Sequence, residues 1–234
     1  MFWGYKVFKP LVWAHRGFSA ELPENGLEAF QQAYRVGAHG IECDVHVTRD
    51  GVVVITHDGS ILVDNRPTSI CDLNWEELRV LSRGSFIRFE DLTQLPDQGL
   101  INIELKEQGT LNGLLVDSVT GLIRRYQWQN RVVFSSFSRA LLDLLNQRMT
   151  GCSLAALWAS RLPADDEFRD LLPFVDGVHV LASYLTRKSL QAFQAAGYSV
   201  VIWDVTAQPE LDRWMDAGVN GVIIDNPLWA AQGR

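Results

Sequence analysis

The most regular feature of the chain is the alternation of short apolar runs with longer amphipathic segments. Eight strand-like runs lie near residues 11–15, 39–44, 101–106, 131–136, 152–157, 176–181, 199–205 and 219–224. Helical periodicity marks most of the segments between them, as in residues 24–37, where Leu27, Phe30 and Tyr34 share one face. Strands that alternate with helices pair in parallel as βα units. Eight such units in 234 residues predict an α/β fold. Among such folds, they favour a (β/α)8 TIM barrel rather than an open doubly wound sheet.

One segment interrupts the alternation after the second predicted strand. Two extended stretches meet at Arg49-Asp50-Gly51, and so short a connection requires an antiparallel hairpin. A two-residue turn would place His57 beside Glu42. The residues that follow, up to Gly99, include a predicted helix at 74–82 and are expected to cover one side of the barrel mouth. We therefore expect a single domain over residues 1–234, with an insertion at about 45–100.

The overall composition narrows the functional classes. A net charge of −7 disfavours binding to nucleic acid or to an anionic membrane surface. No apolar stretch approaches the roughly 20 residues of a membrane-spanning helix, and residues 1–17 lack the features of a signal peptide. Cys43, Cys71 and Cys152 are widely spaced and fit neither a disulfide framework nor a zinc site. We expect a cytoplasmic protein without stable membrane insertion, whose oligomeric state these features leave open.

Charged groups end four of the apolar runs. These ends are His15-Arg16-Gly17, Glu42-Cys43-Asp44, His57-Asp58 and Glu104-Leu105-Lys106, and Pro23-Glu24-Asn25 begins the first predicted helix. Buried strands that end in charged groups are costly unless the charges converge on one site. In a barrel, that site is the C-terminal rim of the strands, where barrel enzymes hold their active sites.

Three carboxylates are expected to meet at this rim. Strand alternation places Glu42, Asp44 and Glu104 on the inward face, and Cys43 on the outward face. Three adjacent carboxylates take up protons unless a cation compensates them. Oxygen ligands suit Mg²⁺, Ca²⁺ or Mn²⁺ better than zinc. The pattern predicts a site for one divalent cation, with a buried salt-bridge network as the alternative.

The same rim carries groups for proton transfer and anion binding. His15 and His57 exchange protons near neutral pH. Arg16 and Lys106 supply positive charge suited to a phosphate oxyanion. Together with a metal, these groups indicate phosphodiester cleavage. The alternatives are structural hydrogen bonds for the histidines and, for Lys106, mere neutralisation of Glu104.

In these motifs the chain resembles the glycerophosphodiester phosphodiesterase family. The matching pieces are WAHRG (13–17), PEN (23–25), GIECDVHVTRDG (40–51), VVVITHD (52–58), NIELK (102–106), SSF (135–137), VVIWDV (200–205) and GVIIDNP (221–227). They follow the family's order over nearly the whole chain. The resemblance implies a TIM barrel with an insertion after the second strand, His15 and His57 as acid–base residues, Glu42, Asp44 and Glu104 as metal ligands, and Arg16 and Lys106 as phosphate contacts.

The implied reaction is hydrolysis of a glycerophosphodiester to glycerol 3-phosphate and an alcohol. Attack by water and attack by the substrate's own glycerol 2-hydroxyl, through a cyclic phosphate, both stay open, as does the identity of the alcohol. Trp203 matches a family aromatic and is expected to wall the substrate pocket with Phe137, with core packing as the alternative. Gly26 and Asp204 replace residues usual in the family, which affects pocket shape and alcohol preference rather than the reaction class.

Four further positions have a structural and a functional interpretation. Glu24 and Asn25 either cap the first helix or orient the site. His46 is expected at a solvated or rim position of the hairpin. Asp225 is expected to cap the last strand.

Two other functions compete with this one. A lysophospholipid phosphodiesterase would need an apolar funnel, for which Phe2, Trp3, Phe8, Phe86, Ile87 and Phe89 are the candidates. A non-catalytic barrel that only binds a ligand is expected to have lost a metal ligand or a histidine, and this chain keeps all of them.

Overall fold

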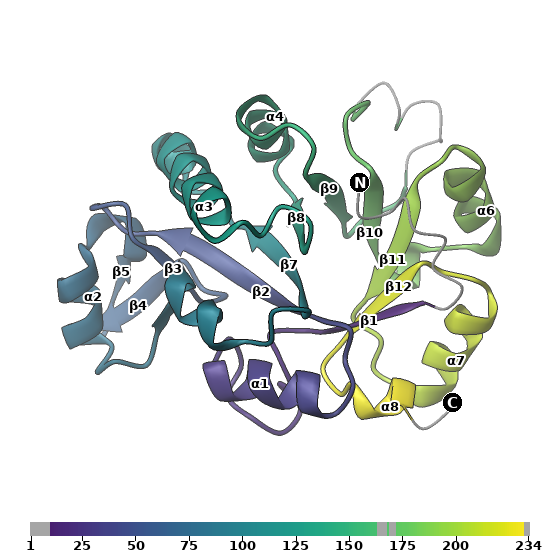
Figure 1. The fold of residues 1–234 in the computed structure, drawn as a ribbon, viewed down its shortest axis with the longest axis horizontal. Helices are drawn as coiled ribbons and strands as arrows, with labels where there is room; N and C mark the ends of the chain where they lie inside the picture. Colours follow the sequence, from purple (N-terminus) through teal and green to yellow (C-terminus); the bar gives the residue numbers. More distant parts are fainter. Residues whose placement is uncertain (1–9, 163–167, 169–171, 232–234) are drawn as a thin grey trace.

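Eight parallel strands close into a barrel in the computed structural model, which describes residues 10–162, 168 and 172–231 (Figure 1). The strands are β1 (Leu11–Ala14), β2 (Gly40–Val47), β7 (Leu100–Leu105), β8 (Val132–Ser136), β9 (Ser153–Trp158), β10 (Gly177–Leu181), β11 (Ser199–Trp203) and β12 (Gly221–Ile224). The ring closes because β1 pairs in parallel with both β12 and β2. The predicted (β/α)8 barrel is confirmed, and each predicted strand matches an observed one to within a few residues.

Helices cover the outside of the barrel, and all of them except the last, a helix of four residues, lie where the periodicity predicts. They are α1 (Leu27–Arg35), α3 (Asn112–Tyr126), α4 (Arg139–Arg148), α6 (Arg187–Ala195), α7 (Gln208–Asp216) and α8 (Leu228–Ala231). Short 3₁₀ turns at Gly109–Leu111 and Ala182–Tyr184 lead from strands toward helices. None of the helices within the described ranges is long and apolar enough to cross a membrane.

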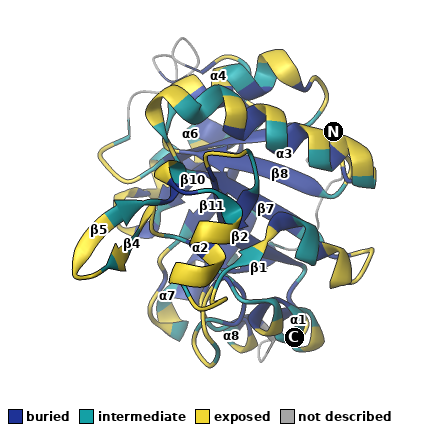
Figure 2. Ribbon diagram, turned by 90° about the vertical axis from the view of Figure 1, so that its left-hand side faces the viewer, coloured by how far each residue is buried: buried dark blue, intermediate teal, exposed yellow. Residues whose placement is uncertain are grey.

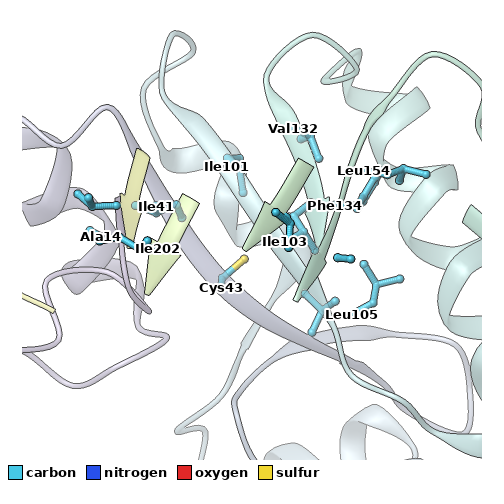
Figure 3. Packing of buried hydrophobic residues seen from close by; sticks show 14 of the residues in the cluster. Ala14, Ile41, Cys43, Ile101, Ile103, Leu105, Val132, Phe134, Leu154 and Ile202 are labelled. Carbon is cyan, nitrogen blue, oxygen red and sulfur yellow. The ribbon is translucent and has the colours of Figure 1, made fainter. Parts of the chain in front are cut away.

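The strands separate two hydrophobic layers, because successive side chains point to opposite faces. Outward-facing residues such as Ile41, Cys43 and Ile103 pack beneath the helices in the main core (Figure 3). A smaller inner cluster that includes Trp13 and Val133 fills the barrel interior. Figure 2 shows the strands of the barrel largely buried and the solvent faces of the helices exposed. Cys43 thus belongs to the core, as its parity predicts.

Residues 48–99, between β2 and β7, form a small substructure on one side of the barrel (Figure 1). It contains β3 (Val53–Ile55), β4 (Ser60–Val63), β5 (Arg66–Ser69), α2 (Trp75–Leu81) and β6 (Ile87–Arg88), with 3₁₀ turns at Ile70–Asp72 and Phe89–Gln94. Asn74 caps α2 in a reciprocal capping box with Glu77. A separate small core that includes Val54, Ile70 and Leu78 holds this part together.

The hairpin between β2 and β3 exists, but its predicted register is wrong by one residue. Val45 pairs with Ile55 and Val47 with Val53, so the turn holds three residues rather than two. Gly51 adopts a left-handed conformation (φ 85°), and the Thr48 carbonyl accepts a hydrogen bond from its N–H. Such three-residue turns with a left-handed glycine are a common hairpin type. His57 therefore does not lie opposite Glu42 in the ladder.

Candidate active site

The C-terminal ends of the barrel strands surround one pocket of about 260 Å³. Its walls include seven of the eight residues that the sequence predicts for the site: His15, Arg16, Glu42, His57, Glu104, Lys106 and Trp203. The eighth, Asp44, is 1 % exposed and lies behind this surface. The structure therefore brings the predicted residues together, although they come from segments far apart in the sequence.

The three predicted metal ligands form a compact acidic cluster. Oxygen atoms of Glu42, Asp44 and Glu104 all lie within 4.8 Å of one another, and all three residues are buried. The pairing of β2 with β7 produces this arrangement, because it sets Asp44 directly beside Glu104. Strand register and side-chain parity together explain the cluster.

The pKa shifts within this cluster fit a site for a cation. Burial, with the nearby charge of Asp44, raises the pKa of Glu42 to about 8. Burial likewise raises the pKa of Glu104. Burial would also raise the pKa of Asp44, but Lys106, Asn25 and Arg16 outweigh it and lower that pKa. An oxygen-only donor set with this excess of negative charge suits a hard divalent cation.

Two basic side chains compensate part of the charge. Lys106 Nζ lies 2.8 Å from Asp44 Oδ1 and 2.6 Å from Glu104 Oε1. Arg16 Nε lies 3.3 Å from Asp44 Oδ2, and its Nη1 donates to both carboxylate oxygens of Glu24. Both basic residues also line the pocket. They are therefore placed both to neutralise carboxylates and to meet an anion in the pocket.

The loop after β1 has an unusual backbone that orients the cluster. Gly17 is left-handed (φ 85°), and a Cβ there would lie 2.7 Å from the backbone of Ala29, so glycine is required. Asn25 is also left-handed (φ 57°), and its Nδ2 donates to Asp44 Oδ2 at 2.9 Å. The Arg16 N–H donates to Glu42 Oε2 at 3.1 Å. Of the two interpretations of Asn25, the orienting one matches these contacts, since Gly26 is the N-cap of α1.

His15 forms a hydrogen bond with Asp225, a residue that the sequence predicts only as a cap of the last strand. Its Nδ1 lies 2.7 Å from Asp225 Oδ1, and Ser19 Oγ donates to the same oxygen. Burial alone would lower the pKa of His15, but the Asp225 hydrogen bond and the charge of Glu42 outweigh it and raise that pKa. The expectation that Asp225 only caps the last strand is incomplete. Knowing that the last strand closes on the first would have revealed the pair, because Ile224 lies beside Ala14.

The Asp225–His15 contact predicts a pH effect. In Asp225→Asn the negative partner is lost, so the pKa of His15 falls and its limb of the kcat/KM profile moves to lower pH. If His15 acts as a base, the acidic limb moves; if it acts as an acid, the alkaline limb moves. We expect a loss of about 10-fold in kcat, as for other groups that orient a catalytic residue. Ser19→Ala should have a smaller effect, and a profile that does not shift in Asp225→Asn contradicts the assignment.

His57 reaches the pocket from the end of the β3 segment. Its Nδ1 lies 2.9 Å from Asp58 Oδ1, and its carbonyl lies 3.2 Å from His46 Nε2. His46 is only 4 % exposed, so its predicted solvated position is wrong. Strand β3 ends at Ile55, and the chain then turns toward the barrel mouth. The contact between His46 Nε2 and the His57 carbonyl holds this segment there.

Aromatic side chains form the opposite wall. Phe137 and Trp203 pack edge to face, with ring centroids 5.9 Å apart. Trp203 Nε1 donates to the His179 carbonyl at 3.2 Å, which fixes the ring. Both aromatic residues line the pocket together with Asp204. The predicted pocket wall is present, and Phe137 remains half exposed there.

Comparison with known proteins gives one consistent family. Residues 15–228 match the model of the glycerophosphoryl diester phosphodiesterase family. A "probable glycerophosphodiester phosphodiesterase 2" from Mycobacterium tuberculosis is 34% identical, over 92% of this chain and 87% of the relative. A glycerophosphodiester phosphodiesterase structure from Thermotoga maritima superposes with a TM-score of 0.79 at 28% identity, covering 96% of this chain and 98% of the other.

A third comparison shows the same fold at lower identity. A phosphodiesterase from Oleispira antarctica, solved with its product sn-glycerol 3-phosphate, has a TM-score of 0.86 at 23% identity. It covers 97% of this chain and 98% of the other. The match to the family model extends over most of the chain. This protein therefore belongs to the glycerophosphoryl diester phosphodiesterase family.

Proposed function

We propose that this protein hydrolyses glycerophosphodiesters to glycerol 3-phosphate and an alcohol, with a divalent cation and two histidines. Membership in the family makes it a phosphodiester hydrolase of this class. The single observation that carries the finer proposal is the pocket in which the acidic cluster, His15 and His57 meet. No other described part of the chain assembles three potential metal ligands.

The acidic cluster is the proposed cation site. Glu42, Asp44 and Glu104 would hold Mg²⁺, Ca²⁺ or Mn²⁺, the ions that oxygen donors favour. When bound, such an ion supplies Lewis-acid stabilisation of charge on a phosphate oxygen. Asn25 and the Arg16 N–H keep two of these carboxylates oriented. Their contribution is to fix the donor atoms before substrate arrives.

The histidines are the proposed proton carriers. His15 and His57 line the pocket, and each Nδ1 is bound to an aspartate, which leaves Nε2 for the substrate. One histidine takes the proton from the attacking hydroxyl, and the other donates a proton to the leaving alkoxide. The attacking hydroxyl belongs either to water or to the glycerol C2 of the substrate. Attack by water gives glycerol 3-phosphate and the alcohol directly. Attack by the C2 hydroxyl releases the alcohol and leaves a cyclic phosphate, and a water molecule must then break its bond to the C2 oxygen to give glycerol 3-phosphate.

The basic residues are the proposed anion contacts. Arg16 presents a guanidinium that Glu24 and Asp44 hold in place, which suits a phosphate oxygen. Lys106 bridges Asp44 and Glu104. A cation bound by those carboxylates would weaken their attraction for the Lys106 ammonium. The ammonium would then be available to the phosphate. The chain's overall charge of −7 makes this local positive charge necessary for an anionic substrate.

The pocket favours a small substrate over a lysophospholipid. Its volume of about 260 Å³ is modest, whereas sites for drug-sized ligands range from roughly 300 to 1,000 Å³. Phe86, Ile87 and Phe89 do not line it, and Phe89 is fully buried. The other funnel candidates, Phe2, Trp3 and Phe8, lie outside the described residues. The insertion therefore does not supply the apolar funnel that a lysophospholipid would need.

The experiment that tests this proposal compares two choline diesters. Purified protein with Mg²⁺, Ca²⁺ or Mn²⁺ is incubated with glycerophosphocholine or with lysophosphatidylcholine, and released choline is measured. We expect release from the glycerol diester and at least about 10-fold less from the lysolipid, because the apolar residues Phe86, Ile87 and Phe89 of the insertion do not extend the pocket for an acyl chain. Equal or faster release from the lysolipid would contradict the proposed substrate class. A barrel that only binds ligands would release choline from neither.

A further inference from the structure

The active-site pocket holds two buried polar side chains to which the protein offers no hydrogen-bond partner. Asn102 on β7 is 1 % exposed and Ser135 on β8 is 0 % exposed, yet both line the pocket. Within the part of the chain that the structure describes, Asn102 Nδ2 and Oδ1 and Ser135 Oγ have no partner. Both residues of the pocket wall thus carry unpaired polar atoms to which no role is assigned.

Their positions relate them directly to the acidic cluster. Asn102 pairs with Glu42 across β2 and β7, and it lies two residues before Glu104 on the same strand face. Ser135 pairs with Glu104 across β7 and β8. The two polar side chains therefore lie beside and beneath the carboxylates, further into the barrel. A molecule that reaches the cluster from the barrel mouth will have its inner end next to them.

Leaving such groups unpaired is costly. A buried amide or hydroxyl without a partner costs about 1–3 kcal/mol, and most buried polar atoms in proteins are paired. An apolar residue would fill the same space in the barrel interior without this cost, as Val133 does on the neighbouring position of β8. The unpaired atoms are therefore best explained by a polar ligand that reaches the pocket floor.

We propose that Asn102 and Ser135 hydrogen-bond the hydroxyl groups of the glycerol moiety and so make the enzyme selective for a vicinal diol. This inference rests on the proposed function and adds the residues that select the glycerol half of the diester. A carboxamide offers both a donor and an acceptor, and a serine hydroxyl offers the same from one atom. Two adjacent hydroxyls present a matching set. Leu157 and Ile223, which line the same pocket, supply apolar surface for the carbon chain.

The chain contains a matched control for this idea. Ser153 on β9 is 2 % exposed, and its Oγ also lacks a partner among the described residues. Unlike Ser135, Ser153 does not line the pocket. Removal of each hydroxyl makes the same chemical change in the same barrel. The two alanine variants should therefore differ only if contact with the ligand is what matters.

The test measures binding of two phosphate monoesters that differ only in the diol. Isothermal titration of the protein, with whichever of Mg²⁺, Ca²⁺ or Mn²⁺ supports turnover, gives Kd for sn-glycerol 3-phosphate and for n-propyl phosphate. In Asn102→Leu, we expect glycerol 3-phosphate to bind about 10- to 100-fold more weakly, from the loss of two hydrogen bonds. Propyl phosphate should stay within about 3-fold of its wild-type Kd, because the substitution removes no contact to it. Ser135→Ala should weaken glycerol 3-phosphate alone by about 3- to 10-fold, and Ser153→Ala should change neither Kd.

Several outcomes overturn the inference. If both ligands weaken equally in Asn102→Leu, or neither weakens, Asn102 does not recognise the diol. If Ser153→Ala acts like Ser135→Ala, the effect comes from barrel packing. Should Asn102→Leu fail to fold, Ser135→Ala against Ser153→Ala decides alone. The proposed function fails in a separate way, in that the wild type would then neither bind glycerol 3-phosphate nor cleave its diesters.

Discussion

His57→Ala and His15→Ala should each lower kcat by roughly 10²- to 10⁴-fold, the range expected for loss of a general acid or base. Both side chains line the pocket next to the acidic cluster, and each is oriented through Nδ1 by an aspartate. Neither histidine belongs to the acidic cluster that is the proposed cation site. Cation affinity should therefore stay within about 3-fold of wild type while turnover falls, since the first ligand shell is unchanged.

His39 provides the control for this experiment. It lies before β2, at the opposite end of the barrel, where its Nδ1 accepts a hydrogen bond from the Val12 N–H. His39→Asn should turn over substrate at the wild-type rate, even if its stability changes. The assay is initial-rate hydrolysis of glycerophosphocholine with saturating cation. Near-normal kcat in His15→Ala or His57→Ala would show that the residue concerned carries no proton in the reaction.

Removing one carboxylate of the cluster should have opposite effects on stability, depending on which one is removed. Glu42 has a pKa of about 8, raised first by burial and then by Asp44. Asp44 instead has a lowered pKa, because Lys106, Asn25 and Arg16 outweigh its burial. In the cation-free protein at pH 7, Glu42→Gln should raise Tm by several degrees, whereas Asp44→Asn should lower it. Both variants should lose more than about 100-fold in cation affinity and in kcat, beyond the roughly 10- to 100-fold seen for outer-shell changes.

The pH dependence of this difference follows from the sign of the shift. The ordinary pKa of a glutamate is 4.5, so the folded protein holds the Glu42 proton between pH 4.5 and about 8 while the unfolded chain does not. Stability therefore falls as pH rises through this range. The Glu42→Gln variant does not lose stability in this way. The difference in Tm between the variant and the wild type should therefore vanish near pH 4 and grow toward pH 8. Thermal unfolding in EDTA at a series of pH values measures it, and an advantage that shrinks with rising pH contradicts the assigned pKa.

Much of the site can be predicted from the sequence, because strand alternation and the ends of apolar runs are local features of the chain. The parity of β2 and β7 is enough to put Glu42, Asp44 and Glu104 on one side, and a parallel barrel is enough to bring those strands together. The ends of apolar runs mark the barrel rim, so His15 also lay where expected. Outward-facing Cys43 follows from the same alternation.

The parts that the sequence left open depend on long-range register or on turn geometry. The Asp225–His15 pair needs the last strand to close beside the first, and no local pattern states which side chains meet there. The hairpin register failed by one residue because Gly51 is left-handed in a three-residue turn. His46 shares the parity of the cluster but is buried beneath the His57 segment, which periodicity alone does not predict.

The most direct test of the whole account is the release of glycerol 3-phosphate from glycerophosphocholine with and without a chelator. Protein treated with EDTA is assayed first, and Mg²⁺, Ca²⁺ or Mn²⁺ is then restored separately, with Glu42→Gln run in parallel. We predict that product disappears with EDTA, returns with at least one ion in the wild type, and does not return in Glu42→Gln. Full product formation by the wild type in EDTA, or no product with any of the three ions, would contradict the cation-dependent site described above.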